Sequence, residues 1–156
     1  MVFESASGVN TDVVLRHTFT GNNDYVVQLN NADGISFKNM TITRTSGNYY
    51  GFIFNILNGS DCLVLDNNVI KGSSTNDYLI YSRASSVANN NNSHQYLNNT
   101  LSTAGYAIVK YGSGSSTTNS ESGTIIESNI ITCVNYIINR YDQDSPLIIN
   151  NSLSSE

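Results

Sequence analysis

The stretch Leu65-Asp66-Asn67-Asn68-Val69-Ile70 places a pair of asparagines between apolar residues, and related stretches recur along the chain. In these copies the first asparagine place is held by Asn or Ser, except in a degenerate first copy. The copies are Val14–Phe19, Phe37–Ile42, Tyr96–Leu101, Ile126–Ile131 and Ile148–Leu153. A repeat at a period of about 20 to 50 residues is typical of solenoids, propellers and arrays.

A second element lies between the asparagine pairs and consists of a tyrosine, usually a smaller apolar residue, and then a bulky apolar residue. It begins at Tyr25, Tyr50, Tyr78, Tyr106 and Tyr136. Both elements lie in short segments rich in Ile, Val, Tyr, Phe and Leu and bounded by Gly, Asn, Ser or Asp, which predicts strands. The repeat is too short for a propeller blade, and no stretch shows helical periodicity. The pattern therefore predicts one coil of a parallel β-solenoid in each repeat.

Stacked coils lie about 4.8 Å apart, so equivalent residues form rows along the solenoid. We expect the tyrosines to stack along one inner corner, with an apolar row two residues later at Val27, Phe52, Ile80, Ile108 and Ile138. Asparagine tolerates the left-handed backbone conformation that a sharp corner needs, and its side-chain amide can bond the next coil. The sequence therefore predicts a structural ladder of Asn68, Asn99, Asn129 and Asn151.

Composition narrows the classes of function. The 156 residues suit a single segment, 1–156, and only 12% are charged, with a net charge of −5. No dense basic face is visible, which disfavours nucleic-acid binding. No apolar run approaches the ~20 residues of a membrane span. The first residues carry no signal peptide, so an export signal would lie upstream. Because neither end has a capping helix, we expect a fragment of a longer solenoid or an oligomer that stacks its ends.

Few residues carry reactive chemistry. Cys62 and Cys133 lie two repeats apart, about 10 Å by coil spacing, and a disulfide needs Cα atoms within roughly 7 Å, so we interpret both as small buried residues. We expect His17 and His94 to be exposed polar residues, and the loop that contains Asn89–Asn92 to be an exposed excursion. Asp142 and Asp144 could contact Ca²⁺, but two carboxylates fall short of the usual six to eight oxygens. No cofactor is therefore predicted.

Two stretches resemble known β-helix repeats. Tyr50–Ile70 resembles the repeat of the pectate-lyase-like superfamily, and Asp24–Ile42 is similar to β-helix regions of very large secreted surface proteins of the Bacteroidota. The resemblance implies an all-β, right-handed parallel β-helix of about five to six coils at an extracellular or cell-surface location. That superfamily includes polysaccharide lyases, glycoside hydrolases, phage tailspikes and adhesins, so the fold alone does not assign an activity.

The catalytic patterns of that superfamily are missing from the aligned positions. Lyases hold Ca²⁺ with carboxylates on successive coils, whereas the fourth positions of the tyrosine strands carry no acid. These positions are Gln28, Ile53, Tyr81, Val109 and Asn139. The Gly-His-Gly and Arg-Ile-Lys motifs of the polygalacturonase-type hydrolases are also absent.

One constellation suggests binding. Arg83, the pair Lys110-Tyr111 and the run Arg140-Tyr141-Asp142 follow the tyrosine strands of three successive coils. Stacked, they would form a basic strip with neighbouring rings, in which arginine matches carboxylates and tyrosine stacks on sugars. The alternative is a set of unrelated solvated side chains, with Arg140 paired to Asp142.

The leading hypothesis is a non-catalytic β-helix segment of a large secreted or cell-surface bacterial protein. It would serve as a stalk or as a glycan-contacting adhesin, with polysaccharide and adjacent coils as its partners. The alternatives are a carbohydrate-active enzyme, either a polysaccharide lyase or a glycoside hydrolase, and a phage tail fibre.

Overall fold

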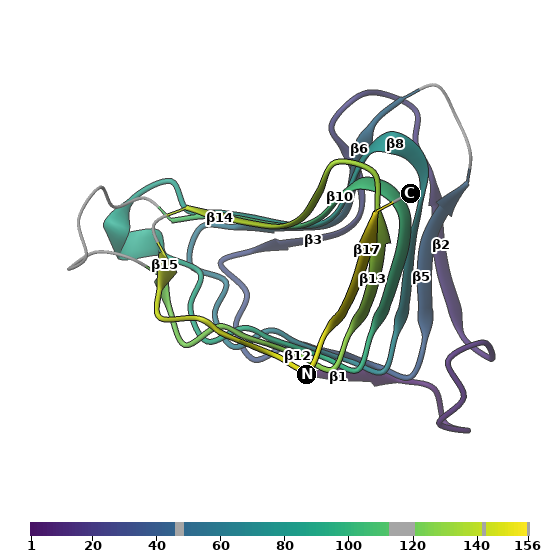
Figure 1. The fold of residues 1–156 in the computed structure, drawn as a ribbon, viewed down its shortest axis with the longest axis horizontal. Coiled ribbons are helices and arrows are strands. Elements are labelled where there is room, and N and C mark those ends of the chain that lie inside the picture. Colours follow the sequence, from purple (N-terminus) through teal and green to yellow (C-terminus); the bar gives the residue numbers. More distant parts are fainter. Residues whose placement is uncertain (46–48, 113–120, 142, 156) are drawn as a thin grey trace.

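The computed structural model describes residues 1–45, 49–112, 121–141 and 143–155, which confirm the predicted all-β parallel solenoid. Each coil has three sides, named lower, side and upper after their places in Figure 1. The lower sheet stacks β1 (Val2–Glu4), β4 (Ser36–Lys38), β7 (Val64–Asp66), β9 (Gln95–Leu97), β12 (Ile125–Glu127) and β16 (Leu147–Ile149).

The side and upper sheets are joined because two strands bend from one into the other. The side sheet stacks β2 (Val14–Thr18), β5 (Thr41–Thr45), β8 (Val69–Arg83), β10 (Thr100–Tyr111), β13 (Ile130–Cys133) and β17 (Ser152–Ser155). The upper sheet contains β3 (Asp24–Asn30), β6 (Gly51–Leu57), the second halves of β8 and β10, and β14 (Tyr136–Tyr141). A short pair, β11 (Glu121–Ser122) and β15 (Gln143–Asp144), and the 3₁₀ helix η1 (Val87–Asn89) complete the described elements.

The solenoid makes about four turns, slightly fewer than the five to six coils expected. The difference lies at the ends of the stack. The lower sheet has six strands, but its outermost members, β1 and β16, each have a neighbouring coil on one side only. The number expected from the sequence includes these end coils, whereas about four turns have a neighbouring coil on both sides.

The core lies inside the coils, where equivalent apolar residues stack as the repeat requires. On the side sheet, Ile42, Ile70 and Leu101 occupy one row and are fully buried. On the lower sheet the equivalent row contains Phe37, Leu65, Tyr96, Ile126 and Ile148. Each large apolar side chain that is buried in such a row contributes roughly 1.5–3 kcal/mol.

The corner between the lower and side sheets is built from the asparagine pairs. The first residue of each pair has a left-handed backbone, with φ between 53° and 56° at Asn39, Asn67, Asn98, Ser128 and Asn150. The second residue points inward and bonds the next coil. The Nδ2 of Asn68 donates to Oδ1 of Asn99 at 3.1 Å, and the Nδ2 of Asn99 donates to Oδ1 of Asn129 at 3.1 Å. The Nδ2 of Asn129 donates to Oδ1 of Asn151 at 3.0 Å, so the four side chains form one ladder.

The tyrosine row differs from the prediction in its register and its direction. Tyr25 pairs with Phe52, which pairs with Tyr78, so Tyr50 lies outside the row and Phe52 takes its place. Tyr106 and Tyr136 continue the row. The row lies on the outer face of the upper sheet rather than at an inner corner, since Tyr25 is 39% exposed and Tyr136 54% exposed. The inner apolar row shifts with the register, and Phe54 occupies the place expected for Phe52.

The two cysteines also differ from the prediction in one respect. Both are free, and Cys133 is buried, but Cys62 is exposed. Cys62 has a left-handed backbone, with φ of 57°, two residues before β7. Residues at the same place before the other lower-sheet strands share this conformation and form a second row of corners. They are Gly34, Ser93, Gly123 and Ser145.

Candidate functional site

The outer face of the upper sheet carries a band of aromatic rings that we call the aromatic floor, defined as Phe52, Tyr78, Tyr81, Tyr106 and Tyr111. The rings contact one another along and across the coils. Tyr78 and Tyr106 stack with ring centroids 4.3 Å apart, Phe52 and Tyr81 lie 4.8 Å apart, and Tyr81 and Tyr111 lie 5.9 Å apart. Aromatic pairs at such distances contribute about 0.5–1.5 kcal/mol beyond the area they bury, so the floor is a fixed surface.

The density of rings follows from an interruption of the strand alternation. In β8, Leu79 and Ile80 are consecutive and both are fully buried. The residues on either side, Tyr78 and Tyr81, therefore face outward although they are three positions apart, and their rings meet at 5.5 Å. Ordinary alternation would send them to opposite faces. Each such coil thus presents two outward positions close together.

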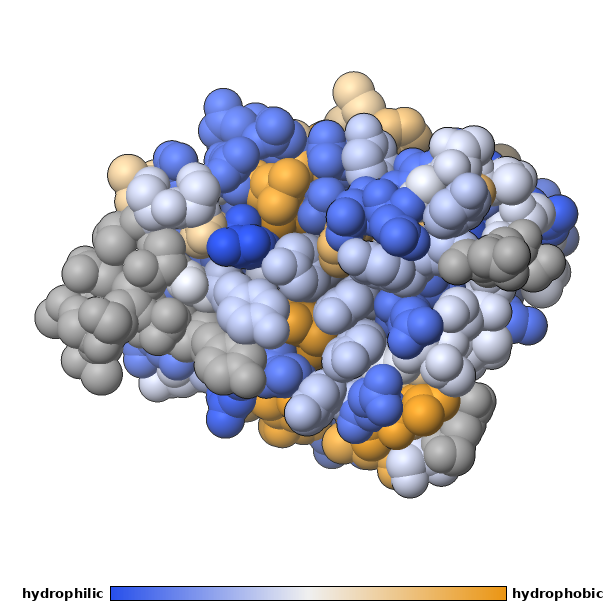
Figure 2. Space-filling view, turned by 90° about the horizontal axis from the view of Figure 1, so that it is seen from above, coloured by the Kyte–Doolittle hydropathy of each residue, from blue (hydrophilic) through white to orange (hydrophobic). Residues whose placement is uncertain are grey.

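Two hollows open on the aromatic floor and share Tyr78. One has a volume of about 560 Å³ and is lined by Tyr78, Tyr81, Arg83, Ala84, Ser85, Tyr111 and Gly112. The other has a volume of about 410 Å³ and is lined by Tyr50, Asn76, Tyr78 and Tyr106. Figure 1 shows the upper sheet between a raised turn, where β8 and β10 bend, and the loop with η1. Figure 2 shows this face, on which pale and blue residues surround small hydrophobic patches.

Arg83 and Tyr111 are the two predicted binding residues that the structure brings into this site. They are register partners on β8 and β10 and line the same hollow. The side chain of Arg83 has no hydrogen bond or ion pair with another described residue, so its guanidinium is available to a ligand. The backbone of Tyr141 continues the same row on β14, whereas Asp142 lies outside the described residues.

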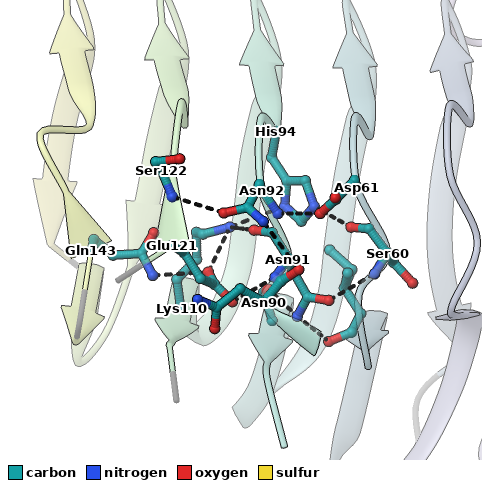
Figure 3. Close-up of polar contacts among 12 residues, drawn as sticks. Ser60, Asp61, Asn90, Asn91, Asn92, His94, Lys110, Glu121, Ser122 and Gln143 are labelled. Carbon is teal, nitrogen blue, oxygen red and sulfur yellow. Dashed lines mark hydrogen bonds and ion pairs between the residues drawn. The ribbon is translucent and has the colours of Figure 1, made fainter. Parts of the chain in front are cut away.

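Lys110 does not belong to an outer basic strip, because it points into the solenoid and is only 2% exposed. Its register partners are Ser82 and Arg140, so it lies one position away from Arg83 and on the opposite face. Its ammonium lies 3.2 Å from the carboxylate of Glu121 and 3.0 Å from Nδ1 of His94 (Figure 3). Burial lowers the pKa of Lys110, and the charge of Glu121 opposes that shift.

His94 is likewise buried, contrary to the prediction of an exposed residue. Its Nε2 lies 2.6 Å from the carbonyl oxygen of Ser60, which can only accept, so Nε2 carries the proton. The single lone pair of Nδ1 then faces two donors, the ammonium of Lys110 at 3.0 Å and the hydroxyl of Tyr96 at 2.8 Å. Burial, followed by the nearby Lys110 charge, holds the pKa of His94 well below its usual range, so the imidazole is neutral.

Asn91 completes this interior polar cluster, which we define as Asn91, His94, Tyr96, Lys110 and Glu121. The loop around Asn91 was expected to be an exposed excursion, but Asn91 is fully buried. Its Oδ1 accepts from the backbone amides of residues 59 and 60 at 2.9 Å, and its backbone amide donates to the carboxylate of Glu121 at 3.0 Å. Because the side chains of the cluster have almost no exposed surface, they join neighbouring coils and do not reach a polymer on the outside.

The remaining predicted charges do not join the aromatic floor. Arg140 is exposed, but with Lys110, Ile108 and Ile126 it lines a small gap on the interior side of the coils. His17, also exposed, lies 3.2 Å from Asp24. Within the described ranges no group of three or more His, Cys, Asp or Glu side chains could hold a metal ion, and no helix is long and apolar enough to cross a membrane.

Sequence reasoning placed Tyr78 in the interior and did not include Tyr81 among the binding residues. Only Tyr78 has tyrosines at the equivalent places of other coils. The residues equivalent to Tyr81 in other coils are Asn55, Val109 and Asn139, so no repeated residue marked this place. Comparison of the chain with protein-family models, curated proteins and solved structures found no match. The parallel solenoid is therefore shown by the structure, while the relationship to the pectate-lyase-like superfamily rests on the resemblance of the repeat.

Proposed function

We propose that this chain is a non-catalytic, glycan-contacting segment of a secreted or cell-surface bacterial protein, and that the aromatic floor is its binding surface. The observation that carries the proposal is the larger hollow, which three tyrosines and Arg83 line together. We further propose that the solenoid is right-handed and related to the pectate-lyase-like superfamily. A right-handed path is the rule for crossovers between parallel strands of one sheet.

The chemistry of the hollow suits a sugar chain. Tyrosine offers a flat apolar ring for a sugar face and a hydroxyl for its polar edge. Arg83 supplies forked donors that match a carboxylate, which favours a glycan containing uronic acid. The tyrosines recur on successive coils, about 4.8 Å apart, and therefore form an extended contact surface along the solenoid axis. An extended polymer fits this arrangement better than a compact ligand.

The lining of the two hollows favours binding over cleavage. Glycoside hydrolysis uses a pair of carboxyl groups that flank the scissile bond. The described residues that line these hollows include no Asp, Glu or His. The titratable groups of the interior polar cluster are buried on the other side of the sheet. A stalk without ligand remains the alternative that the following experiment distinguishes.

The test is a polysaccharide panel of polygalacturonate, alginate and neutral mannan, each with and without Ca²⁺. We expect binding to a uronate polymer, weakened about tenfold by Tyr81→Ala and by Arg83→Gln, in proportion to one lost ring contact or charge-assisted hydrogen bond. Lys38→Gln is the matched control, because Lys38 lies on the lower sheet and lines neither hollow. Absence of binding to the whole panel would favour the stalk. Release of unsaturated sugars that is lost in Arg83→Gln would establish a lyase and overturn the non-catalytic assignment.

A further inference from the structure

A second groove, lying on the outer face of the side sheet, shares no lining residue with the aromatic floor. We call it the threonine groove. Its volume is about 530 Å³, within the range of about 300–1,000 Å³ that is usual for ligand sites. It is lined by Arg16, Thr41, Thr43, Arg44, Thr45, Lys71, Gly72, Ser73 and Thr103. Nothing in the repeat pattern requires cations at this place.

Two cations of the groove lie in one row of the sheet. Arg16 pairs with Thr43, and Thr43 pairs with Lys71, so the two charges flank a threonine across three coils. Their backbones are about 10 Å apart by coil spacing, a gap that two long side chains can close over Thr43. Both side chains are exposed, and neither has a hydrogen bond or ion pair with another described residue.

Ser73 provides an independent observation. Its hydroxyl oxygen is buried at the groove and has no hydrogen-bond partner among the described residues. A buried polar group without a partner is costly, and it is expected where a ligand or water supplies the missing bond. The backbone amide of Ser73 is already used, since it donates to Asp77 at 2.9 Å. The hydroxyl is therefore the group of Ser73 that can still form a hydrogen bond.

The charge of the groove is positive. The described residues that line it include no acid. Arg44, the third cation of the lining, lies 2.8 Å from Asp77 in an ion pair with no exposed surface on either side chain. This pair neutralises itself, so Arg16 and Lys71 set the charge that a ligand meets.

We propose that the threonine groove binds an anionic group on a sugar polymer, either a sulfate ester or a uronate carboxylate, between Arg16 and Lys71. The neighbouring Ser73 and threonine hydroxyls bond the oxygens of the same sugar, because each hydroxyl can both donate and accept. The described residues that line the groove include no aromatic ring, so affinity comes from charge and hydrogen bonds and falls as salt is raised. The site does not depend on the function proposed for the aromatic floor.

The experiment measures binding of dextran sulfate, polygalacturonate, uncharged dextran and single-stranded DNA at low and physiological salt. We expect the double variant Arg16→Gln/Lys71→Gln to bind dextran sulfate or polygalacturonate about tenfold more weakly, the combined effect of two exposed ion pairs. Lys38→Gln is the charge control, because Lys38 lies on the lower sheet outside the groove. Arg83→Gln, which alters the aromatic floor, separates failure of one site from failure of the other.

Ser73→Ala tests the hydroxyl without a risk to folding. Because this hydroxyl has no partner to lose, the variant should unfold at the same temperature as the parent chain or higher and yet bind the anionic polymer about threefold more weakly. Equal losses in the Lys38→Gln control and the double variant would overturn the proposal. Binding of single-stranded DNA as tight as that of the anionic sugars would also overturn it, since it would indicate general attraction of polyanions.

Discussion

Asn99 lies in the middle of the asparagine ladder, and its replacement by alanine tests what holds the coils in register. Asn99 is 1% exposed. Its Oδ1 accepts from the backbone amide of Asn68 at 3.0 Å and from the Nδ2 of Asn68 at 3.1 Å. Its Nδ2 donates to the carbonyl of Leu65 at 2.8 Å and to Oδ1 of Asn129 at 3.1 Å. Asn99→Ala removes all of these bonds at a site that is closed to bulk solvent.

The loss can be estimated from these contacts. A typical hydrogen bond contributes about 1 kcal/mol net, and a buried donor left without a partner costs about 1–3 kcal/mol. The backbone amide of Asn68 becomes such a donor. The Nδ2 of Asn68 keeps its bond to the carbonyl of Phe37, and Oδ1 of Asn129 keeps the backbone amide of residue 99. We therefore expect Asn99→Ala to lower the free energy of unfolding by about 4 kcal/mol.

Asn151 is the matched control at the end of the same ladder. Its Oδ1 accepts from the backbone amide of Asn129 and its Nδ2 donates to the carbonyls of Ile126 and Ile149, all at 2.9 Å, but the residue is only partly buried. Water can replace these bonds, so Asn151→Ala should cost about 1–2 kcal/mol. Urea unfolding followed by far-ultraviolet circular dichroism measures both variants. Equal losses for Asn99→Ala and Asn151→Ala would refute the view that buried amides hold the register.

The isosteric change Asn99→Asp adds a test with a defined sign. The new oxygen would face the carbonyl of Leu65 and Oδ1 of Asn129, which are both acceptors. The folded state then disfavours the carboxylate and raises its pKa above the unfolded value of about 3.9. The variant should be least stable at neutral pH and should regain stability as pH falls through the folded pKa towards the unfolded one. A stability profile parallel to that of Asn99→Ala would contradict the assigned hydrogen bonds.

Three further predictions concern buried charge and exposed thiol. The pKa of His94 is held below the unfolded value of about 6.5, so the unfolded chain binds the proton first as pH falls. The free energy of unfolding should therefore fall by up to about 1.4 kcal/mol per pH unit below that value. His94→Gln should remove this pH dependence in urea titrations at pH 4–7. Asp77→Ala should cost about 3–5 kcal/mol in the same assay, because it leaves Arg44 buried without its carboxylate, whereas a loss below 1 kcal/mol would show that the pair is dispensable. Cys62 should react with a thiol reagent in the folded protein and Cys133 only after unfolding, as mass spectrometry of labelled peptides would detect.

The corner beside the lower sheet could be predicted from sequence because its chemistry is nearly uniform. Asparagine or serine occupies the left-handed position in the five repeats from Phe37 onward, and asparagine follows it in four of them. The second row of corners has the same geometry but mixed residues, such as Gly34, Cys62 and Ser93. These positions share a left-handed backbone but no common type of side chain. A search for residues that repeat at a fixed spacing therefore could not detect this second row of corners.

The register of the tyrosine row could not be predicted, because Tyr50 and Phe52 are both aromatic and lie two positions apart. The pairing of Asp24 with Gly51 settles the register. A Cβ atom at residue 51 would lie 2.1 Å from the carbonyl oxygen of Asp24, so only glycine fits beside that strand. This constraint comes from a neighbouring coil, and spacing within one coil does not contain it.

The interior polar cluster was hidden from sequence reasoning for a related reason. A lone histidine, lysine or glutamate in a polar loop is normally solvated, and His94, Lys110 and Glu121 are far apart in the chain. Coiling of the chain brings His94 to 3.0 Å and Glu121 to 3.2 Å from the ammonium of Lys110. Their burial is a property of neighbouring coils together.

The aromatic floor arises where the repeat is least regular. A strand that alternates strictly offers one outward residue in every two, and the equivalent residues of successive coils then form rows about 4.8 Å apart. In β6, Ile53 and Phe54 both turn inward, as Leu79 and Ile80 do in β8. This irregularity brings the rings of Phe52, Tyr78 and Tyr81 together on the outside. The buried asparagine ladder holds the coils in register at another corner, while the upper sheet departs from regular alternation and gathers the rings on the surface that we propose as a binding site.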